Sequence, residues 1–236
     1  MSRQLAVIFD MDGVLVDSYQ AHFRSWQMVA AEEGRVVTEA EFAAHFGRTS
    51  REIIAGWWGS QQADDARVAE LDARKEAAFR EILRREFPAM PGAVELLEQL
   101  HQAGFAIALG SSGPPENVDL VLERLGKREL FGAVVTGSDV TRGKPDPQVF
   151  LLAASRLGVP PPCCAVVEDA PPGIAAAKAA GMAAVGLVST GRTREVLAQA
   201  DLVIDSLSDL SPILMEDLVV HNQRGSGSDN PHHLQE

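Results

Sequence analysis

The fold of this chain is decided by a short stretch near its N-terminus, Leu5-Ala6-Val7-Ile8-Phe9-Asp10-Met11-Asp12-Gly13. Its first five residues are all apolar, and acidic residues follow at once. A continuous apolar run predicts a strand that is buried on both faces, as in a parallel sheet. We interpret further runs of the same kind as the remaining strands of that sheet: Phe105–Leu109, Ala133–Val135, Ala165–Val167, Ala183–Val188 and Leu202–Ile204.

Helical patterns separate these runs. Asp146 and Pro147 are typical of the N-cap and the first position of a helix, here over Gln148–Leu157. Gly181 is typical of the end of a helix that begins after Pro172. Strands and helices therefore alternate, which predicts an α/β core with a doubly wound parallel sheet.

Residues 16–88 break this alternation, because they contain helical patterns and no convincing strand. We expect an α/β core from residues 1–15 and 89–220 and a helical insertion, 16–88, that forms a cap domain. Residues 221–236 are rich in Gly and Ser and predict a disordered tail. The helices expected in the insertion are Ser18–Glu33, Glu39–Phe46, Ser50–Trp58 and Ala63–Phe87.

Composition excludes several classes of protein. The 236 residues are 46% hydrophobic and 23% charged, and they include 21 Lys and Arg against 33 Asp and Glu, for a net charge of −12. This balance argues against nucleic acid as a partner, because a phosphate backbone requires clustered positive charge. A small anionic substrate needs only a few local cations and stays possible.

The N-terminal residues and the cysteines indicate in which cellular compartment the protein is expected. No apolar run approaches the ~20 residues of a membrane span, and five apolar residues before Asp10 are too few for a signal-peptide core. Cys163 and Cys164 are adjacent, so they predict no disulfide framework. We therefore expect a cytoplasmic protein with no membrane partner. Separately, we expect a monomer.

Candidate catalytic residues follow the first apolar run. In an open α/β sheet, ligands bind at the carboxyl ends of the strands. Asp10 and Asp12 are two residues apart, so on an extended chain both carboxylates can face one site. Adjacent carboxylates repel each other and attract a cation, and their hard oxygens suit Mg²⁺. Taken alone, this pattern is a weak signal and would favour a solvated turn.

Three other strand ends support the first. Ser111 and Ser112 precede a helix, where they could cradle an anion or, in the case of Ser112, simply cap that helix. Lys144 follows the third run and could alternatively be a solvated loop residue. The fourth run ends at Glu168 and Asp169, an acidic pair that is costly to bury without a cation or hydrogen bonds.

Together these residues predict phosphoryl transfer. One carboxylate can attack phosphorus, a second can move the proton, and a metal and Lys144 can neutralise the phosphoryl oxygens. The chain is itself strongly acidic, so an anionic substrate requires both of those cations.

The residues Phe9–Ser18 resemble the first motif of the haloacid dehalogenase superfamily, in its phosphatase branch. Ser111, Lys144 and the pair Glu168-Asp169 are similar to its second, third and fourth motifs in order and spacing. The resemblance implies that Asp10 is the nucleophile, which forms an aspartyl-phosphate, and that Asp12 is the general acid and base. It further implies Mg²⁺ bound by the Asp10 side chain, the Asp12 backbone carbonyl and Asp169, with help from Glu168.

The helical insertion resembles that of β-phosphoglucomutase and its relatives. His22-Phe23-Arg24-Ser25-Trp26, Ser50-Arg51-Glu52 and Lys75 with Phe79 are similar to the patterns of that family. The resemblance implies that His22, Arg51 and Lys75 contact the substrate or the catalytic acid. From the residues alone, His22 could equally be a packed histidine. Lys75 shares a helical face with apolar residues, so we expect its ammonium to meet the anionic substrate.

One departure from the mutase pattern affects the predicted function. The mutases have a Lys-Asn pair after the second motif, whereas this chain has Glu116 and Asn117. Ser112 and Asn117 remain candidates for substrate binding, but binding of a bisphosphate is put in doubt. We therefore predict a Mg²⁺-dependent phosphatase of small phosphorylated metabolites, with sugar phosphates as the expected substrates. A β-phosphoglucomutase and a non-catalytic phosphometabolite-binding protein are the alternatives.

Overall fold

The computed structural model describes residues 4–225, which form two compact units. The core takes the chain up to Asp17 and resumes at Ala89, and the helical insertion is Ser18–Pro88. The chain leaves the core two residues later than the sequence pattern predicted. The reason is that Val16 still pairs with Asp12 and with Ala89, both in the core.

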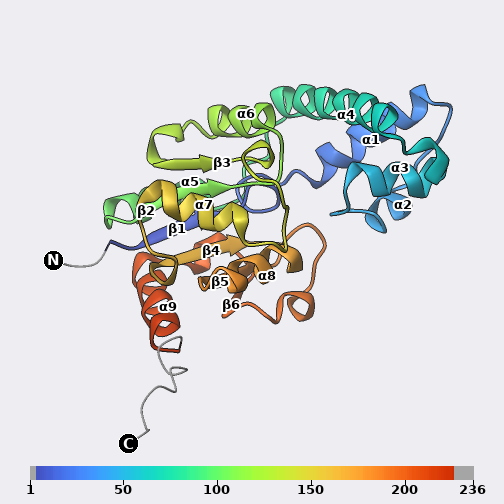
Figure 1. The fold of residues 1–236 in the computed structure, drawn as a ribbon. Coiled ribbons are helices and arrows are strands. Elements are labelled where there is room, and N and C mark those ends of the chain that lie inside the picture. Colours follow the sequence, from blue (N-terminus) through green and yellow to red (C-terminus); the bar gives the residue numbers. More distant parts are fainter. Residues whose placement is uncertain (1–3, 226–236) are drawn as a thin grey trace, which may run out of the picture. The chain divides into compact units, whose positions relative to one another are not determined.

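The core contains a six-stranded parallel sheet in the order β3-β2-β1-β4-β5-β6 (Figure 1). This order confirms the doubly wound α/β fold, since the chain moves outward from β1 first in one direction and then in the other. Phe9 pairs with Leu109 on one side and with Val167 on the other, so the ends of these strands lie side by side. The strands are β1 (Ala6–Phe9), β2 (Ala106–Gly110), β3 (Ala133–Val135), β4 (Cys164–Glu168), β5 (Ala183–Leu187) and β6 (Leu202–Ile204).

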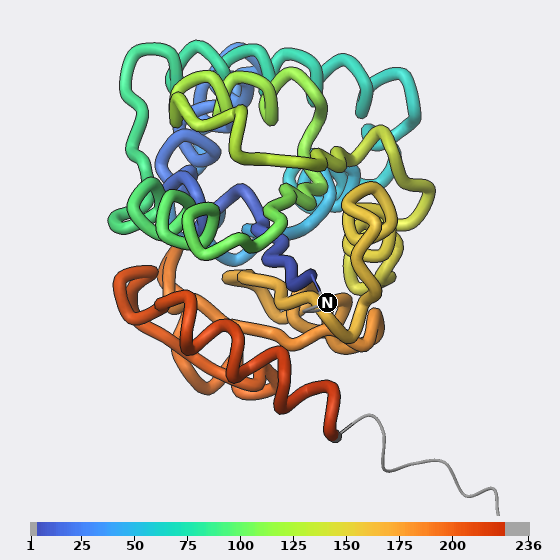
Figure 2. The backbone as a smooth tube through the Cα atoms, turned by 90° about the vertical axis from the view of Figure 1, so that its left-hand side faces the viewer, coloured from blue at the N-terminus to red at the C-terminus, as the bar shows by residue number. Residues whose placement is uncertain are grey.

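Helices cover both faces of this sheet. The yellow α7 and the orange α8 lie on one side, and the green α5 and the red α9 lie on the other (Figure 2). Apolar residues of α7 and α8, among them Phe150 and Ile174, pack with Ile8 and Val166 of the sheet in one buried cluster. Cys163 and Cys164 are buried free thiols, as expected. The helices of the core are α5 (Ala93–Gln102), α6 (Pro115–Leu125), α7 (Gln148–Leu157), α8 (Pro171–Ala179) and α9 (Pro212–Gly225).

Helix α9 corrects the predicted tail, because residues 221–225 belong to it. Met215 and Val219 of this helix are buried, which anchors it to the core. Its last turns are held as well, since the Asn222 amide donates a hydrogen bond to the Gly181 carbonyl oxygen at 3.0 Å. Helix α7 also differs in detail: Pro147 occupies its N-cap position, while the Asp146 carboxylate still accepts from the Gln148 N–H at 3.0 Å. The rest of the predicted tail, 226–236, lies outside the described residues.

The helical insertion contains α1 (Tyr19–Glu32), α2 (Glu39–Ala43), α3 (Ser50–Trp58) and α4 (Asp65–Arg85). Helices α2 and α3 both begin with a capping box, in which Thr38 pairs with Glu41 and Thr49 with Glu52. Helix α2 ends three residues before the predicted Phe46. The insertion has its own apolar core, which includes Phe23, Trp26, Phe42, Ile54, Trp57 and Leu71.

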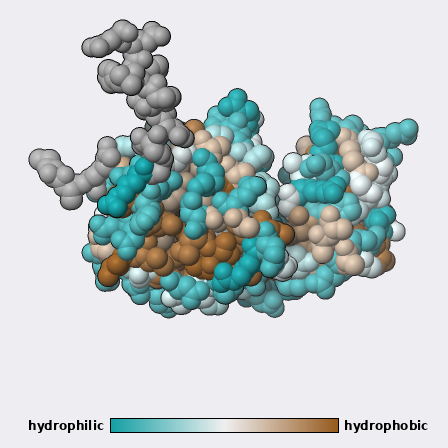
Figure 3. Space-filling view, turned by 90° about the horizontal axis from the view of Figure 1, so that it is seen from below, coloured by the Kyte–Doolittle hydropathy of each residue, from teal (hydrophilic) through white to brown (hydrophobic). Residues whose placement is uncertain are grey.

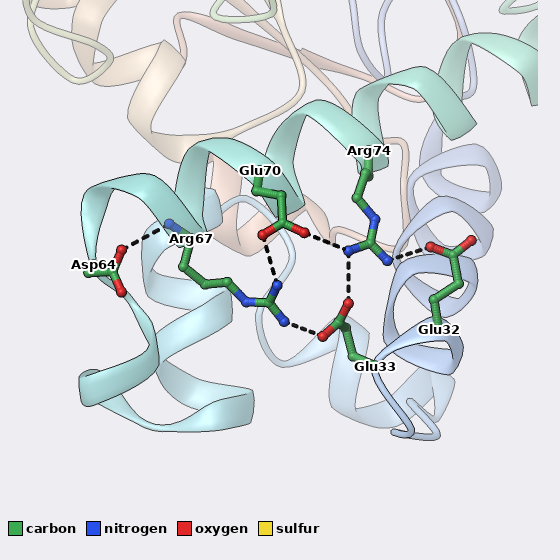
Figure 4. Close-up of polar contacts among 6 residues, drawn as sticks. All are labelled: Glu32, Glu33, Asp64, Arg67, Glu70 and Arg74. Carbon is green, nitrogen blue, oxygen red and sulfur yellow. Dashed lines mark hydrogen bonds and ion pairs between the residues drawn. The ribbon is translucent and has the colours of Figure 1, made fainter.

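A network of ion pairs joins α1 to α4 within the insertion (Figure 4). The Glu33 carboxylate accepts from Arg67 and from Arg74, the latter at 2.8 Å, and Arg74 also contacts Glu32 at 2.5 Å. Glu70 bridges the two arginines at 2.9 and 3.0 Å. The hydrogen bonds from Arg74 and Arg67 lower the pKa of Glu33. These charges are therefore engaged with one another and stabilise the insertion.

The surface of the core carries an apolar patch surrounded by hydrophilic residues (Figure 3). The most exposed of the large apolar side chains in the described core is Ile213. Single exposed apolar residues are ordinary on proteins and imply no function by themselves. Within residues 4–225, no helix has the length and apolar character required to span a membrane.

Candidate active site

The nucleophile predicted from the sequence, Asp10, lies directly after β1, between the ends of β2 and β4. Its backbone N–H donates to the Val167 carbonyl oxygen at 2.9 Å, so the ladder between β1 and β4 continues to this residue. The side chain of Asp10 is only 10% exposed. Gly13 then turns the chain with φ of +75°, and a Cβ there would lie 2.3 Å from Asp169 Oδ2. A glycine is therefore required both by the turn and by the carboxylate beside it.

Lys144 joins two strand ends that are far apart in sequence. Its Nζ lies 2.5 Å from Asp10 Oδ1 and 2.7 Å from Glu168 Oε1, and it also lies 4.8 Å from the centre of the Phe150 ring. Burial tends to lower the pKa of Lys144, but the carboxylates of Asp10 and Glu168 raise it above its usual range. Lys144 is therefore a fixed cation of the site and not a solvated loop residue.

The carboxylate of Glu168 is held in one orientation. Oε1 accepts from Lys144, and Oε2 accepts from the backbone N–H of Ala170 at 2.7 Å. The first turn of α8 packs so closely that a Cβ on Gly173 would lie 1.7 Å from Oε1. Sequence analysis assigned no role to Gly173, although it follows the acidic pair by only a few residues.

Asp169 has partners that sequence analysis missed. Its Oδ2 accepts from the Thr190 hydroxyl at 2.7 Å and from the Arg192 guanidinium. The hydroxyl of Ser189 lies 3.4 Å from the same oxygen and donates to the Gly13 carbonyl oxygen at 2.7 Å. These residues directly follow β5, so the rule applied to the other strand ends would have found them.

The site contains the ligands for a divalent cation. Asp10, Glu168 and Asp169 each offer a carboxylate oxygen, and these oxygens lie within 4.8 Å of one another. All three residues are buried. A buried set of hard oxygen donors fits Mg²⁺. Two cationic side chains, Lys144 and Arg192, already contact these carboxylates, which indicates how strongly the cluster attracts positive charge.

The electrostatics of the cluster follow from its burial. Burial raises the pKa of Asp10 well above its usual range, against the opposing effect of Lys144. The neighbouring carboxylates of Glu168, Asp12 and Asp169 raise the pKa of Asp10 further. Burial and Glu168 likewise raise the pKa of Asp169 to about 6, while Arg192 and Thr190 lower it. A bound cation would therefore favour the ionised form of both residues.

The remaining predicted residues of the core occupy the same edge of the sheet. Asp12 is close enough to influence Asp10, as its effect on the Asp10 pKa indicates. Ser111 is buried after β2, and its hydroxyl oxygen accepts from the Gly113 N–H at 3.0 Å. Ser112 is exposed. The N-cap residue of α6 is Pro114, so the interpretation of Ser112 as an N-cap is wrong. Asn117 is buried in the first turn of α6.

In the helical insertion, His22 and Lys75 lie together. Lys75 Nζ is 2.9 Å from His22 Nδ1, and the His22 ring stacks on Phe79 with centroids 4.2 Å apart. Because an ammonium only donates, Nδ1 of His22 accepts, and a neutral ring carries its proton on Nε2. Lys75 Nζ also lies 2.7 Å from Glu76 Oε1. Lys75 therefore already has an anionic partner within the insertion, and its predicted contact with the substrate stays a prediction.

Arg51 is engaged within the insertion as well. Its guanidinium donates to the Ala63 carbonyl oxygen at 2.5 Å and forms an ion pair with Asp65. Half of the Arg51 side chain and nearly all of the Asp65 side chain are exposed. Such an exposed pair is weak, so an anion could compete for Arg51.

Comparison with known proteins connects this geometry to a family. Residues 5–181 match the model of the haloacid dehalogenase-like hydrolases. The chain is 36% identical over 219 residues to the β-phosphoglucomutase of Bacillus subtilis, and this alignment covers 90% of this chain and 94% of that protein. It is 35% identical over 209 residues to the validoxylamine A 7′-phosphate phosphatase of Streptomyces hygroscopicus subsp. limoneus, covering 86% and 94%.

A solved structure shares the fold. CbbY of Rhodobacter sphaeroides, as a variant in complex with xylulose-(1,5)bisphosphate, superposes with a TM-score of 0.79 at 27% identity. The match covers 88% of this chain and 96% of that one. The similarity therefore extends over both units of the chain and is not limited to the sheet.

Proposed function

Because this chain belongs to the haloacid dehalogenase-like hydrolases, we propose that it is a Mg²⁺-dependent phosphatase of small phosphorylated metabolites, with sugar phosphates as its substrates. It is a phosphoryl-transfer enzyme, like the relatives described above. The observation that carries the proposal is the cluster of Asp10, Glu168 and Asp169 with Lys144 between two of the three carboxylates.

Asp10 is the proposed nucleophile. One of its carboxylate oxygens attacks phosphorus, the bond to the leaving oxygen breaks, and an aspartyl-phosphate forms. Asp12 donates a proton to the leaving oxygen and then takes one from the water that hydrolyses the intermediate. Hydrolysis releases inorganic phosphate and returns Asp10 to its carboxylate form.

Lys144 and the other acidic residues prepare the site for this chemistry. Lys144 contacts Asp10 Oδ1, so it holds the nucleophile and places a positive charge where phosphoryl oxygens gain negative charge. Ser111, with its hydroxyl in the loop after β2, is the proposed hydrogen-bond donor to the phosphoryl group. Mg²⁺, held by Asp10, Glu168, Asp169 and the Asp12 backbone carbonyl, would neutralise charge on the phosphate when bound.

The helical insertion is proposed to select the substrate. His22, Arg51 and Lys75 are its candidate contacts, joined by Ser112 and Asn117 of the core. The Lys75 ammonium donates a hydrogen bond to Nδ1 of His22. The ion pair of Arg51 with Asp65 is exposed, so a substrate anion can replace Asp65 as the partner of Arg51. These features suit recognition of a phosphorylated, hydroxyl-rich molecule.

A mutase is the second candidate, and the 36% identity to a β-phosphoglucomutase favours it. In that reaction, the phosphorylated Asp10 would return its group to a sugar hydroxyl instead of to water. Glu116 argues against it, because it places a negative charge where the mutase pattern has a lysine.

A screen of phosphate esters tests the proposal. The pure protein with Mg²⁺ is offered sugar phosphates, including β-glucose 1-phosphate with a bisphosphate activator. Release of inorganic phosphate supports the phosphatase, and formation of glucose 6-phosphate supports the mutase. If no ester is turned over, both fail and a non-catalytic phosphometabolite-binding protein is left.

A further inference from the structure

The segment after β5 brings a second cation to the acidic cluster. The side chain of Arg192 is 18% exposed, and its guanidinium forms an ion pair with Asp169, whose side chain is 6% exposed. The same guanidinium nitrogen donates to the Thr190 hydroxyl oxygen at 2.5 Å. Among the described contacts, Lys144 forms hydrogen bonds and ion pairs with Asp10 and Glu168 but not with Asp169. Arg192 is thus bound to the third carboxylate of the cluster.

The local backbone holds this arginine in place. Thr190 and Gly191 adopt positive φ of 52° and 76°, and the Arg192 N–H donates to the Ser189 carbonyl oxygen at 2.9 Å. A threonine at positive φ is an unfavourable conformation for a β-branched residue. Ser189 in turn donates to the Gly13 carbonyl oxygen, so the segment is tied to the turn that follows Asp10. Arg192 is therefore a positioned part of the site and not a chance surface contact.

The position of Arg192 has a consequence for cation binding. A metal that uses Asp169 must share or take a carboxylate that the guanidinium already neutralises. Like charges at such short range in a partly buried site repel each other. A guanidinium also remains charged at all working pH values, so it cannot give way by losing a proton.

On the basis of the metal-dependent function proposed above, we propose that Arg192 is the counter-ion of Asp169 in the metal-free enzyme and sets the affinity for the divalent cation. Arg192 stabilises the Asp169 carboxylate before the metal arrives, and the metal must displace or weaken this ion pair. The arginine thereby lowers metal affinity and makes loading of the site reversible. An arginine that only oriented Asp169 for the metal would have the opposite effect, because its removal would weaken binding.

The test compares Arg192→Gln with Arg194→Gln, a matched control. Arg194 lies two residues further along and pairs with Asp205, away from the cluster. Mg²⁺ binding is measured by calorimetry on the substrate-free proteins. We expect Arg192→Gln to bind Mg²⁺ roughly 3- to 30-fold more tightly than the wild type, as removal of one adjacent charge implies. Arg194→Gln should bind as the wild type does, and Arg192→Lys should lie between the two.

Thermal unfolding gives a second readout. Without metal, Arg192→Gln should unfold at a lower temperature than Arg194→Gln, and Mg²⁺ should raise its unfolding temperature by a larger amount. If Arg192→Gln does not fold, the inference is tested by NMR of the guanidinium groups in the wild type. The signals of Arg192 are assigned by their absence from the spectrum of Arg192→Lys. These signals should shift on addition of Mg²⁺, and signals that stay unchanged would overturn the inference.

The outcomes separate this inference from the proposed function. If the wild type binds Mg²⁺ and hydrolyses esters, while Arg192→Gln binds with equal or lower affinity, only the role of Arg192 is wrong. If the wild type binds no Mg²⁺, or if Asp169→Asn binds it equally well, the metal site itself is wrong and both fall.

Discussion

Within residues 4–225, the core and the helical insertion each hold a lysine with little exposed side chain, and these two lysines have different partners. In the core, Lys144 is 10% exposed and contacts carboxylates from two separate strand ends. In the insertion, Lys75 is 6% exposed and contacts the carboxylate of Glu76, its neighbour on the same helix, together with His22. Phe150 lies near the first ammonium and Phe79 near the second.

This difference indicates two kinds of site. Around Lys144, the carboxylates outnumber the ammonium group, so we expect the core to attract further cations. Around Lys75, the described contacts are the carboxylate of Glu76 and the ring nitrogen of His22, both within the insertion. We therefore expect the chemistry to depend on the partners of Lys144, and the choice of substrate on the partners of Lys75.

The largest effect is expected from removing the partner carboxylate of Lys144. Asp10→Asn should lower kcat by at least about 10⁴-fold, because it removes the nucleophile. Incubation with substrate should leave no phosphorylated protein, as judged by intact-protein mass spectrometry. Glu76→Gln, which removes the partner of Lys75, is the matched control and should keep its turnover of a small aryl phosphate. Similar losses in both variants would erase the distinction between the two sites.

Removing Lys144 itself should affect both rate and stability. Lys144→Met is expected to lower kcat by about 10²–10³-fold, as for loss of one group that stabilises developing charge. It also leaves the buried carboxylates without their main counter-ion, so metal-free stability should fall by about 3–5 kcal/mol. Urea unfolding with and without Mg²⁺ checks this, and Mg²⁺ should restore much of the loss. If Lys144→Met and the wild type have the same free energy of unfolding without metal, the role assigned to Lys144 is wrong.

Lys75→Met keeps the apolar stem and removes the charge. We expect it to raise KM for a sugar phosphate by about tenfold, the effect of one lost hydrogen bond to a charged group. Kinetics with a small aryl phosphate, which lacks the sugar hydroxyls, should change little. Equal losses on both substrates, together with a lower unfolding temperature, would mean that Lys75 serves only to hold Glu76 and His22.

The smallest effects concern surface charge pairs, one in each unit. Hydrogen bonds from Arg156 and from the Thr136 N–H lower the pKa of Asp139 in the core to about 2, from an ordinary value of 3.8. A carboxyl group whose pKa is lowered by folding stabilises the folded state at pH values above its ordinary pKa. This stability is lost as the pH falls from about 4 to about 2. Asp139→Asn should therefore lower the unfolding temperature at pH 7 by a few degrees, and by less at pH 2.

Glu33→Gln is the counterpart in the insertion and should behave in the same way, because Arg74 and Arg67 lower the pKa of Glu33. Thermal unfolding at both pH values checks the two variants together. If a substitution lowers the unfolding temperature by the same amount at pH 7 and at pH 2, the replaced carboxylate contributes through packing and not through its charge.

Much of the core could be predicted from the sequence because its strands are buried on both faces. Such strands leave continuous apolar runs, and the residues that follow them must meet at one edge of the sheet. Asp10, Ser111, Lys144 and the pair Glu168-Asp169 were located in this way. The same rule would have located Ser189, Thr190 and Arg192 after β5, had it been applied there.

Other features have no comparable sequence signal. Adjacent residues of a helix do not normally face each other, so nothing in the sequence pairs Lys75 with Glu76. The end of α9 was missed because Asn222 and Gln223 are polar, and only their contacts with Gly181 and Cys163 in the folded core explain why the helix continues.

The sequence by itself determined the alternation of strands and helices, the inserted helical unit and the identity of the acidic strand ends, because burial imposes a periodic pattern on neighbouring residues. Only the tertiary structure decided which charges meet. Lys144 contacts Asp10 across 134 positions of the chain, and Arg192 contacts Asp169 across 23. Such pairs depend on how separate strand ends and loops pack against one another, and packing between distant segments leaves no periodic trace in the sequence.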